Sequence, residues 1–132
     1  MRLLVPRSLL DYFIEYTSRS RIEECGLLVG EVEDDVWSVK ALFIGINIDN
    51  SPVRFSIDPL TIISAHEYGD RYGYDVVSVI HSHPAPPFPS ELDKKGMSMW
   101  RIPWVIVDST THKIGIWIYR EGGVYPVEYN II

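Results

Sequence analysis

The chain has 132 residues, of which 46% are hydrophobic and 23% charged, as expected of one globular domain. Its formal net charge is −6 and its lysines and arginines form no cluster, so we expect no nucleic-acid partner. The single cysteine, Cys25, excludes an intrachain disulfide, and no run approaches the roughly 20 apolar residues of a membrane span. These features predict a cytoplasmic protein without a membrane partner.

The first part of the chain predicts a helix followed by a strand hairpin. Pro6 suits the first turn of a helix, because its fixed φ is already helical. One face of this helix, at three- and four-residue spacing, comprises Leu10, Phe13, Ile14 and Thr17. Apolar runs over 25–32 and 36–46 predict two strands, and the acidic segment 33–35 between them is typical of a hairpin turn.

The middle of the chain predicts a short strand over 55–57, then a helix and a buried strand. Asp58 and Pro59 predict the start of the helix, since aspartate caps a helix and proline fits its first turn. Gly69 is a natural stop for that helix. The apolar run over 75–82 then predicts the buried strand.

The last third of the chain predicts one more helix and three strands. Ser90 predicts the start of a helix that reaches about Trp100. Strands are predicted over 104–108 and 113–119, joined by a polar turn. A final edge strand is predicted over 124–129, where the proline is consistent with an edge.

The predicted order of elements indicates a single domain over residues 1–132. Strands dominate both ends of the chain, helices interrupt them, and no repeat or linker divides the sequence. We therefore expect the α+β class, with a mixed, mostly antiparallel β-sheet flanked by helices.

The segment His81-Ser82-His83-Pro84 directly follows the predicted buried strand. Residues two apart in an extended chain point to the same side, so both imidazoles can converge on one metal ion while Ser82 points away. Pro84 favours extended geometry for the residue before it and keeps His83 in line with His81. Taken alone, the motif is more typical of surface histidines at the end of a strand.

Ser90 and Asp93 open the next predicted helix. Their spacing is that of a capping box, in which the serine and the acidic residue each bond the other's backbone. A carboxylate in the first helical turn can also face back toward the histidines, so the two interpretations are compatible. Two imidazoles and one carboxylate form a ligand set of catalytic zinc that leaves a position for water.

Together these segments resemble the His-x-His-Pro…Ser-x-x-Asp signature of the JAMM (MPN+) zinc metalloprotease family, and the combination in this order is highly specific. Residues 23–30, Glu-Glu-Cys-Gly-Leu-Leu-Val-Gly, look like the family's Glu-x-Cys-Gly-Leu-Leu-x-Gly strand. Residues 55–59 are similar to the family's usual entry into its second helix. The resemblance spans about residues 20 to 110. The interval between His83 and Asp93 is one residue shorter than the family's common spacing.

The resemblance implies a deubiquitinase-like zinc metallopeptidase, with one Zn²⁺ per chain held by His81, His83 and Asp93. It implies that Glu23 is the acid–base group and that Ser90 helps to stabilise the oxyanion. The implied substrate is a peptide or isopeptide bond at the C-terminus of a ubiquitin-like or sulfur-carrier protein, cleaved by a minimal prokaryote-type enzyme. The implied fold resembles the MPN/JAMM, cytidine-deaminase-like sandwich.

Two alternatives belong to other classes. A non-catalytic MPN scaffold would only bind partners, but such proteins typically lose metal ligands, whereas every signature residue is present here. A zinc deaminase would require paired cysteine ligands, and the single Cys25 excludes its usual form. The sequence leaves open whether the chain forms a homo-oligomer.

Overall fold

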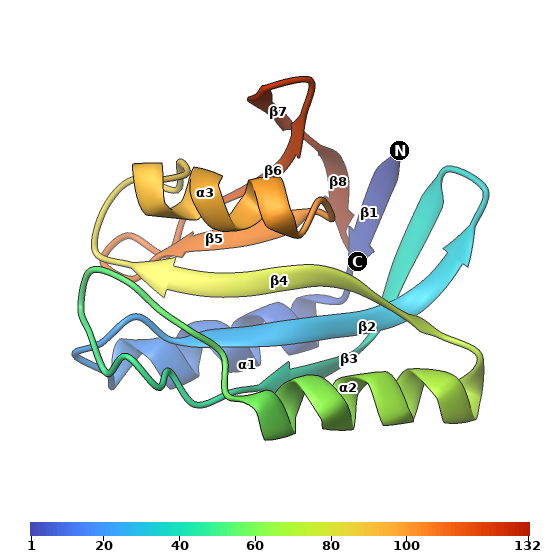
Figure 1. Cartoon of the computed structure of the whole chain (residues 1–132), viewed down its shortest axis with the longest axis horizontal. Coiled ribbons are helices and arrows are strands. Elements are labelled where there is room, and N and C mark those ends of the chain that lie inside the picture. The colour runs from blue at the N-terminus through green and yellow to red at the C-terminus, as the bar shows by residue number, and fades with distance from the viewer.

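The computed structural model describes all residues from Met1 to Ile132. Its strands are β1 (Arg2–Val5), β2 (Cys25–Glu33), β3 (Val36–Ile44), β4 (Asp75–His83), β5 (Trp104–Asp108), β6 (Ile114–Arg120), β7 (Gly123–Pro126) and β8 (Glu128–Ile131). Its helices are α1 (Arg7–Ser18), α2 (Pro59–Tyr72) and α3 (Glu91–Met99). All eight strands form one sheet in the order β7-β6-β5-β4-β2-β3-β1-β8 (Figure 1).

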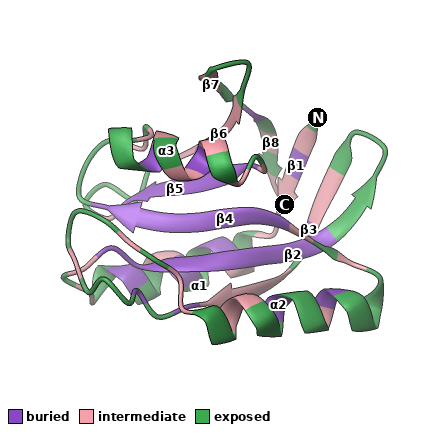
Figure 2. Ribbon diagram, in the orientation of Figure 1, coloured by how far each residue is buried: buried purple, intermediate pink, exposed green.

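The sheet is mixed and mostly antiparallel, which confirms the predicted α+β class. β2 pairs antiparallel with β3 and β4, and β6 pairs antiparallel with β5 and β7. The parallel pairs are β4 with β5 and β1 with both β3 and β8. β4 and β5 are buried along most of their length because they lie inside the sheet, with a hydrophobic core on each of its faces (Figure 2).

The helices lie on two sides of the sheet. α1 packs Leu10 and Phe13 into a core with Leu28 and Ile80, behind the sheet in Figure 1. α2 and α3 cover the opposite face, where Ala65, Met97, Leu27, Val79 and Trp104 belong to a second core. Along β2, β5 and the last part of β4 (79–83), alternate residues therefore face different helices, and this alternation decides which side chains reach the site. None of the three helices has the length and apolar character needed to cross a bilayer.

Two predictions for the middle of the chain were wrong. The segment 55–57 is not a strand, since only one isolated bridge joins Ile57 to Asn47. α2 does not stop at Gly69, where a Cβ would lie 2.6 Å from the carbonyl oxygen of Tyr74. It continues to Tyr72 and ends at Gly73, whose φ of 73° provides the left-handed cap.

The predicted final strand is two strands, and an N-terminal strand was missed. β7 and β8 lie at opposite ends of the strand order, although only Val127 separates them. The N–H of Val127 donates to the carbonyl oxygen of Ile116 at 2.9 Å, so the sheet curls until its two edges approach each other. β8 then pairs with β1, a contact between the two ends of the chain that no local pattern indicates.

Candidate metal site

The carboxyl end of β4 places two histidines on one face of the sheet. His81 pairs with the first residue of β2, and the N–H of Ser82 donates to the carbonyl oxygen of Glu24 at 3.0 Å. This register places Glu23 opposite His83, on the face that α2 and α3 cover. The ring centroids of His81 and His83 are 5.5 Å apart. Ser82 and Glu24 face the other way, toward α1.

α3 brings a carboxylate to the two histidines. Ser90 and Asp93 form the predicted capping box: the Ser90 N–H donates to Asp93 Oδ2 at 2.9 Å, and the Asp93 N–H donates to Ser90 Oγ at 3.0 Å. Asp93 Oδ1 lies 3.1 Å from His81 Nε2, and Oδ2 lies 3.9 Å from His83 Nε2. The short loop before α3 therefore keeps Asp93 within reach of both histidines, and one carboxylate serves the helix cap and the cluster together.

The three residues form a group that could hold a metal ion. All are buried, and one potential ligand atom from each lies within 4.8 Å of the others. Both ring nitrogens of His81 and of His83, and Oε1 of Glu23, make no hydrogen bond of good geometry within the chain, although His81 Nε2 lies 3.1 Å from Asp93 Oδ1. Buried polar atoms are nearly always paired, so unpaired atoms on three neighbouring side chains are consistent with a site that a ligand completes. Two imidazoles and a carboxylate suit a first-row metal such as zinc.

Glu23 and Asp93 have opposite pKa shifts. Burial, and then the nearby charge of Asp93, raises the pKa of Glu23 to about 8. Burial alone would raise the pKa of Asp93 as well, but the His81 ring and the bonds from Ser90 outweigh it and lower that pKa. Glu23 is thus a buried carboxyl that exchanges its proton near neutral pH, which suits acid–base work.

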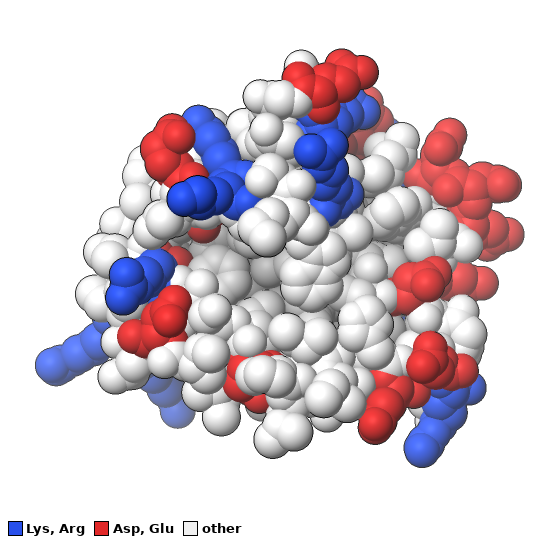
Figure 3. Space-filling model, viewed as in Figure 1, with Lys and Arg blue, Asp and Glu red and all other residues white.

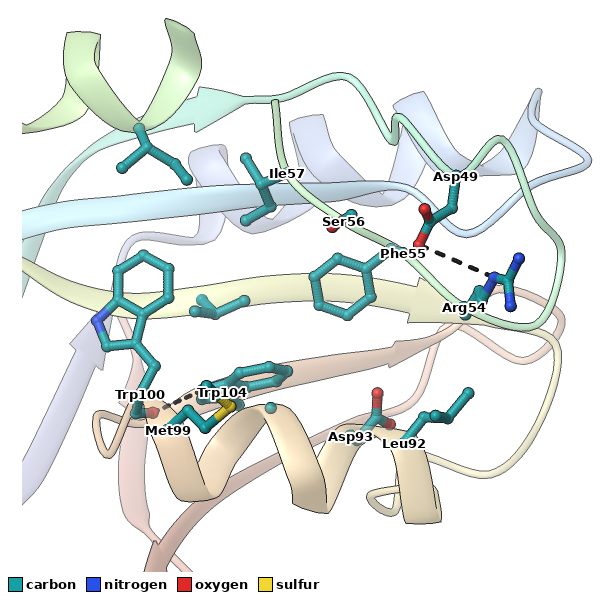
Figure 4. Close-up of a pocket in the computed structure, with 13 residues that line it drawn as sticks. Asp49, Arg54, Phe55, Ser56, Ile57, Leu92, Asp93, Met99, Trp100 and Trp104 are labelled. Carbon is teal, nitrogen blue, oxygen red and sulfur yellow. Dashed lines mark hydrogen bonds and ion pairs between the residues drawn. The ribbon is translucent and has the colours of Figure 1, made fainter. Parts of the chain in front are cut away.

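A groove of about 510 Å³ begins at Asp93 and runs between α3 and the segment 49–57. Figure 4 shows Asp93 and Leu92 near one end of it, Met99 and Trp100 at the other, and Trp104 between them. In Figure 3 uncharged atoms line the hollow between α2 and α3, and lysine and arginine side chains lie on the α3 side. The shape and lining suit an extended, largely uncharged peptide segment.

Two residues that sequence reasoning missed support this site. Phe55 stacks on the His81 ring, with centroids 4.6 Å apart and planes at 26°. Asn47 is buried and donates to the carbonyl oxygen of Glu23 at 2.8 Å and to that of Arg54 at 3.0 Å, while its Oδ1 accepts from the Ser56 N–H at 3.0 Å. Asn47 thereby ties the wall of the groove to the backbone that carries Glu23. No spacing rule in the sequence marks either residue.

The other two histidines of the chain and its cysteine lie apart from the cluster. His66 is exposed on α2, and His112 is exposed in the turn between β5 and β6. Cys25 is fully buried, and burial, followed by the charge of Glu24, raises its pKa to about 12. A thiol in that state is a poor nucleophile.

Comparison with known proteins points to one family. The family described as prokaryotic homologs of the JAB domain matches residues 6–119. Desampylase of Pyrococcus furiosus is 38% identical over 120 residues, which cover 90% of this chain and 82% of that protein. A probable TtuB-protein conjugate cleaving protease of Thermus thermophilus is 34% identical over 107 residues, covering 79% and 68%.

Two solved structures share the fold. Protein DSY2949 from Desulfitobacterium hafniense superposes with a TM-score of 0.87 at 24% identity, over 100% of this chain and 93% of that one. A protein from Salinibacter ruber gives a TM-score of 0.72 at 23% identity, over 100% and 92%. At these identities the similarity establishes the architecture alone.

Proposed function

The chain belongs to the family of prokaryotic JAB-domain homologs, and from this premise we propose that it is a zinc-dependent isopeptidase. Its proposed substrate is the bond that joins the C-terminus of a ubiquitin-like or sulfur-carrier protein to an amine. The observation that carries the proposal is the buried set of unpartnered atoms on His81, His83 and Glu23, beside Asp93. Both relatives are named for releasing such conjugates, which supports the substrate class.

In this proposal His81, His83 and Asp93 hold the zinc ion. A zinc ion held by these residues would lower the pKa of a bound water to about 7 and polarise a carbonyl group. Glu23 Oε1, which has no partner within the chain, accepts the proton of the attacking water and returns it to the leaving amine. Burial raises the pKa of this carboxyl in the zinc-free protein, and a zinc ion beside it would lower that pKa and favour the carboxylate that accepts a proton.

In this proposal Ser90 stabilises the developing oxyanion. Its Oγ already accepts the Asp93 N–H at 3.0 Å, so its own hydroxyl hydrogen is free to donate outward. Ser90 itself is exposed, at the end of the groove where Asp93 lies. A donor held in place by the helix cap needs little reorganisation when the negative charge forms.

The groove is the proposed site for the extended tail of the substrate. Its lining includes Phe55, Val79 and Trp104, and it leads to Asp93. Gly96 lies directly against the Trp104 ring, since a Cβ there would be 2.9 Å from the ring. A side chain at position 96 would therefore press on that ring, which also lines the groove.

We also propose that the protein acts in the cytoplasm. A reducing cytoplasm suits a protein whose one cysteine is free and buried.

The proposal is tested by metal content and cleavage on one preparation. Protein purified without added zinc should contain close to one zinc per chain. It should release a ubiquitin-like protein that is linked through its C-terminus to a lysine side chain. A chelator should stop the reaction and added zinc should restore it. Wild-type protein that binds no zinc at micromolar concentrations would contradict the enzyme and favour the non-catalytic scaffold.

A further inference from the structure

The loop between β4 and α3, residues 84–89, carries Ser90 and Asp93 to the site. It rises from the tip of β4 to the start of α3 (Figure 1). Four of its six residues are prolines, which have no N–H group to donate. Within the loop the only backbone hydrogen bond joins the Phe88 N–H to the carbonyl oxygen of Pro86 at 2.7 Å. Backbone bonding therefore does little to fix where this loop lies.

One side chain ties the loop to the sheet. Trp117 of β6 donates its indole Nε1–H to the carbonyl oxygen of Pro87 at 2.8 Å, and no other hydrogen bond joins residues 84–89 to the rest of the protein. The Phe88 ring packs on the same indole, with centroids 5.3 Å apart. A residue 30 positions away in the sequence from Pro87 thus contacts two adjacent residues of the loop.

The sheet provides a matching gap for this contact. Gly115 lies two residues before Trp117, on the same face of β6. A Cβ at Gly115 would come within 2.3 Å of the Pro87 carbonyl oxygen and 2.7 Å of Trp117 Nε1. Glycine is therefore required for the carbonyl and the indole to meet, because any side chain at position 115 would separate them.

The contact between Trp117 and the loop lies beside the strand row that contains His81. His81 pairs with Ile106 of β5, and Ile106 pairs with Gly115 of β6, so these three residues form one row across the sheet. The loop is anchored at this row by Pro87, three residues before Ser90. The anchor and the cluster are thus fixed to the same strands.

We propose that Trp117 is a positioning residue that acts through Pro87 to set where Ser90 and Asp93 lie relative to the histidines. Trp117 does not touch the metal cluster. Its hydrogen bond restrains the loop, and the loop restrains the capping box whose carboxylate faces His81. The inference rests on the proposed function, because it explains how Asp93 is held at a zinc site.

Two substitutions break the contact from opposite sides. Trp117→Phe keeps an aromatic ring for Phe88 and removes the donor, whereas Gly115→Ala keeps the indole and blocks its approach to Pro87. Trp37→Phe is the matched control, because Trp37 lies on β3 and makes no contact with the loop. It makes the same chemical change in the core on the α1 side, so a general loss of packing would appear there too.

The first measurement uses zinc-free protein and amide hydrogen exchange. Trp117→Phe and Gly115→Ala should speed exchange at the Ser90 and Asp93 amides by about 3- to 10-fold. This is the factor expected when the net stabilisation from one hydrogen bond is lost. Zinc affinity, measured by competition with a chelating dye, should fall by a similar factor. Trp37→Phe should change neither quantity.

The outcomes separate this inference from the proposed function. Folded Trp117→Phe with unchanged exchange at Ser90 and Asp93 and wild-type zinc affinity would overturn the inference, whatever Gly115→Ala does. An equal change in Trp37→Phe would also overturn it, because the effect would then be general. Wild-type protein that binds no zinc would remove the proposed function, while the exchange measurement would still decide whether Trp117 positions the loop.

Discussion

Buried polar residues of β2 and β4 are hydrogen-bonded on one face of the sheet and lack hydrogen bonds on the other. Toward α1, Ser82 Oγ accepts the Glu24 N–H at 3.1 Å, and the Glu24 carboxylate accepts from a serine hydroxyl at 2.8 Å. The adjacent residues Glu23, His81 and His83 face α2 and α3, and each carries buried atoms that make no hydrogen bond of good geometry within the chain. All five residues are buried, so burial does not separate the two sets.

The difference lies in hydrogen bonding, and it indicates which face was shaped for a ligand. A buried polar group without a partner costs about 1–3 kcal/mol, so a sequence selected for stability alone would not keep five such atoms together. On the α1 face the same kinds of side chain are paired and stabilise the ladder. We therefore expect the metal to bind on the face with the unpaired set, and the substitutions below test that contrast.

The largest effect is expected from the three cluster residues. His81→Ala, His83→Ala and Asp93→Ala each remove one ligand from a three-ligand set. Losing a residue that only supports a ligand costs up to about 100-fold in metal affinity. Losing a ligand itself should therefore lower zinc affinity by more than about 100-fold and abolish measurable turnover. Metal analysis of the purified variants checks this. Full zinc and activity in Asp93→Ala would leave helix capping as its only role.

Glu23 and Glu24 give the sharpest test, because they are adjacent and of one type. Glu23→Gln should keep zinc and lower turnover by about 10²- to 10⁴-fold, since the amide cannot accept the proton of water. Glu24→Gln should leave turnover near wild type, because its side chain faces α1. Zinc content and cleavage should be measured on the same samples. A large loss at Glu24 in place of Glu23 would mean that the assignment of the two faces is wrong.

The pH dependence of stability should also differ between these two residues. In zinc-free protein the raised pKa lets Glu23 keep its proton up to about pH 8, while in the unfolded chain the carboxyl loses it near 4.5. Between these values the unfolded state binds fewer protons, so stability should fall as pH rises, by at most about 5 kcal/mol. Urea unfolding at several pH values should show this slope in wild type and in Glu24→Gln, and its loss in Glu23→Gln. Parallel profiles for all three would contradict the raised pKa.

Ser90→Ala should have a smaller effect. Loss of one oxyanion donor costs about 10²-fold in turnover, while the zinc ligands remain. The substitution also removes half of the capping box, worth about 1 kcal/mol of stability. Ser98→Ala is a suitable control, since Ser98 lies on the same helix and its hydroxyl donates to the Lys95 carbonyl oxygen. Wild-type turnover in Ser90→Ala would assign this serine to capping alone.

Local sequence patterns could predict the arrangement within two pairs of site residues, whereas the approach of Glu23 and Asp93 to the histidines depends on distant segments and was indicated by the family resemblance. Residues two apart on a strand share a face, so the side of His81 and His83 followed from their spacing. The capping-box spacing likewise predicted how Ser90 and Asp93 pair. The roles of these residues remain predictions for the experiments above.

Contacts between distant segments could not be predicted in this way. β1 and β8 form a pair across nearly the whole chain, and each is only four residues long. Phe55 reaches His81 because a loop folds over the sheet, not because of any periodicity. Gly69 and Gly73 look alike in the sequence. Only the structure shows that the first allows a close approach and the second the left-handed cap.

The smallest functional effect is expected at Ser82, although it lies between the two histidines. Ser82→Ala leaves the Glu24 N–H buried without its acceptor, so the free energy of unfolding should fall by about 1–3 kcal/mol. Zinc affinity and turnover should stay within about 2-fold of wild type, because the side chain lies on the α1 face. Chemical denaturation and zinc competition on one preparation check both halves. Wild-type stability combined with a large loss of zinc would mean that Ser82 supports the histidines directly, and hydrogen bonding would then no longer distinguish the two faces.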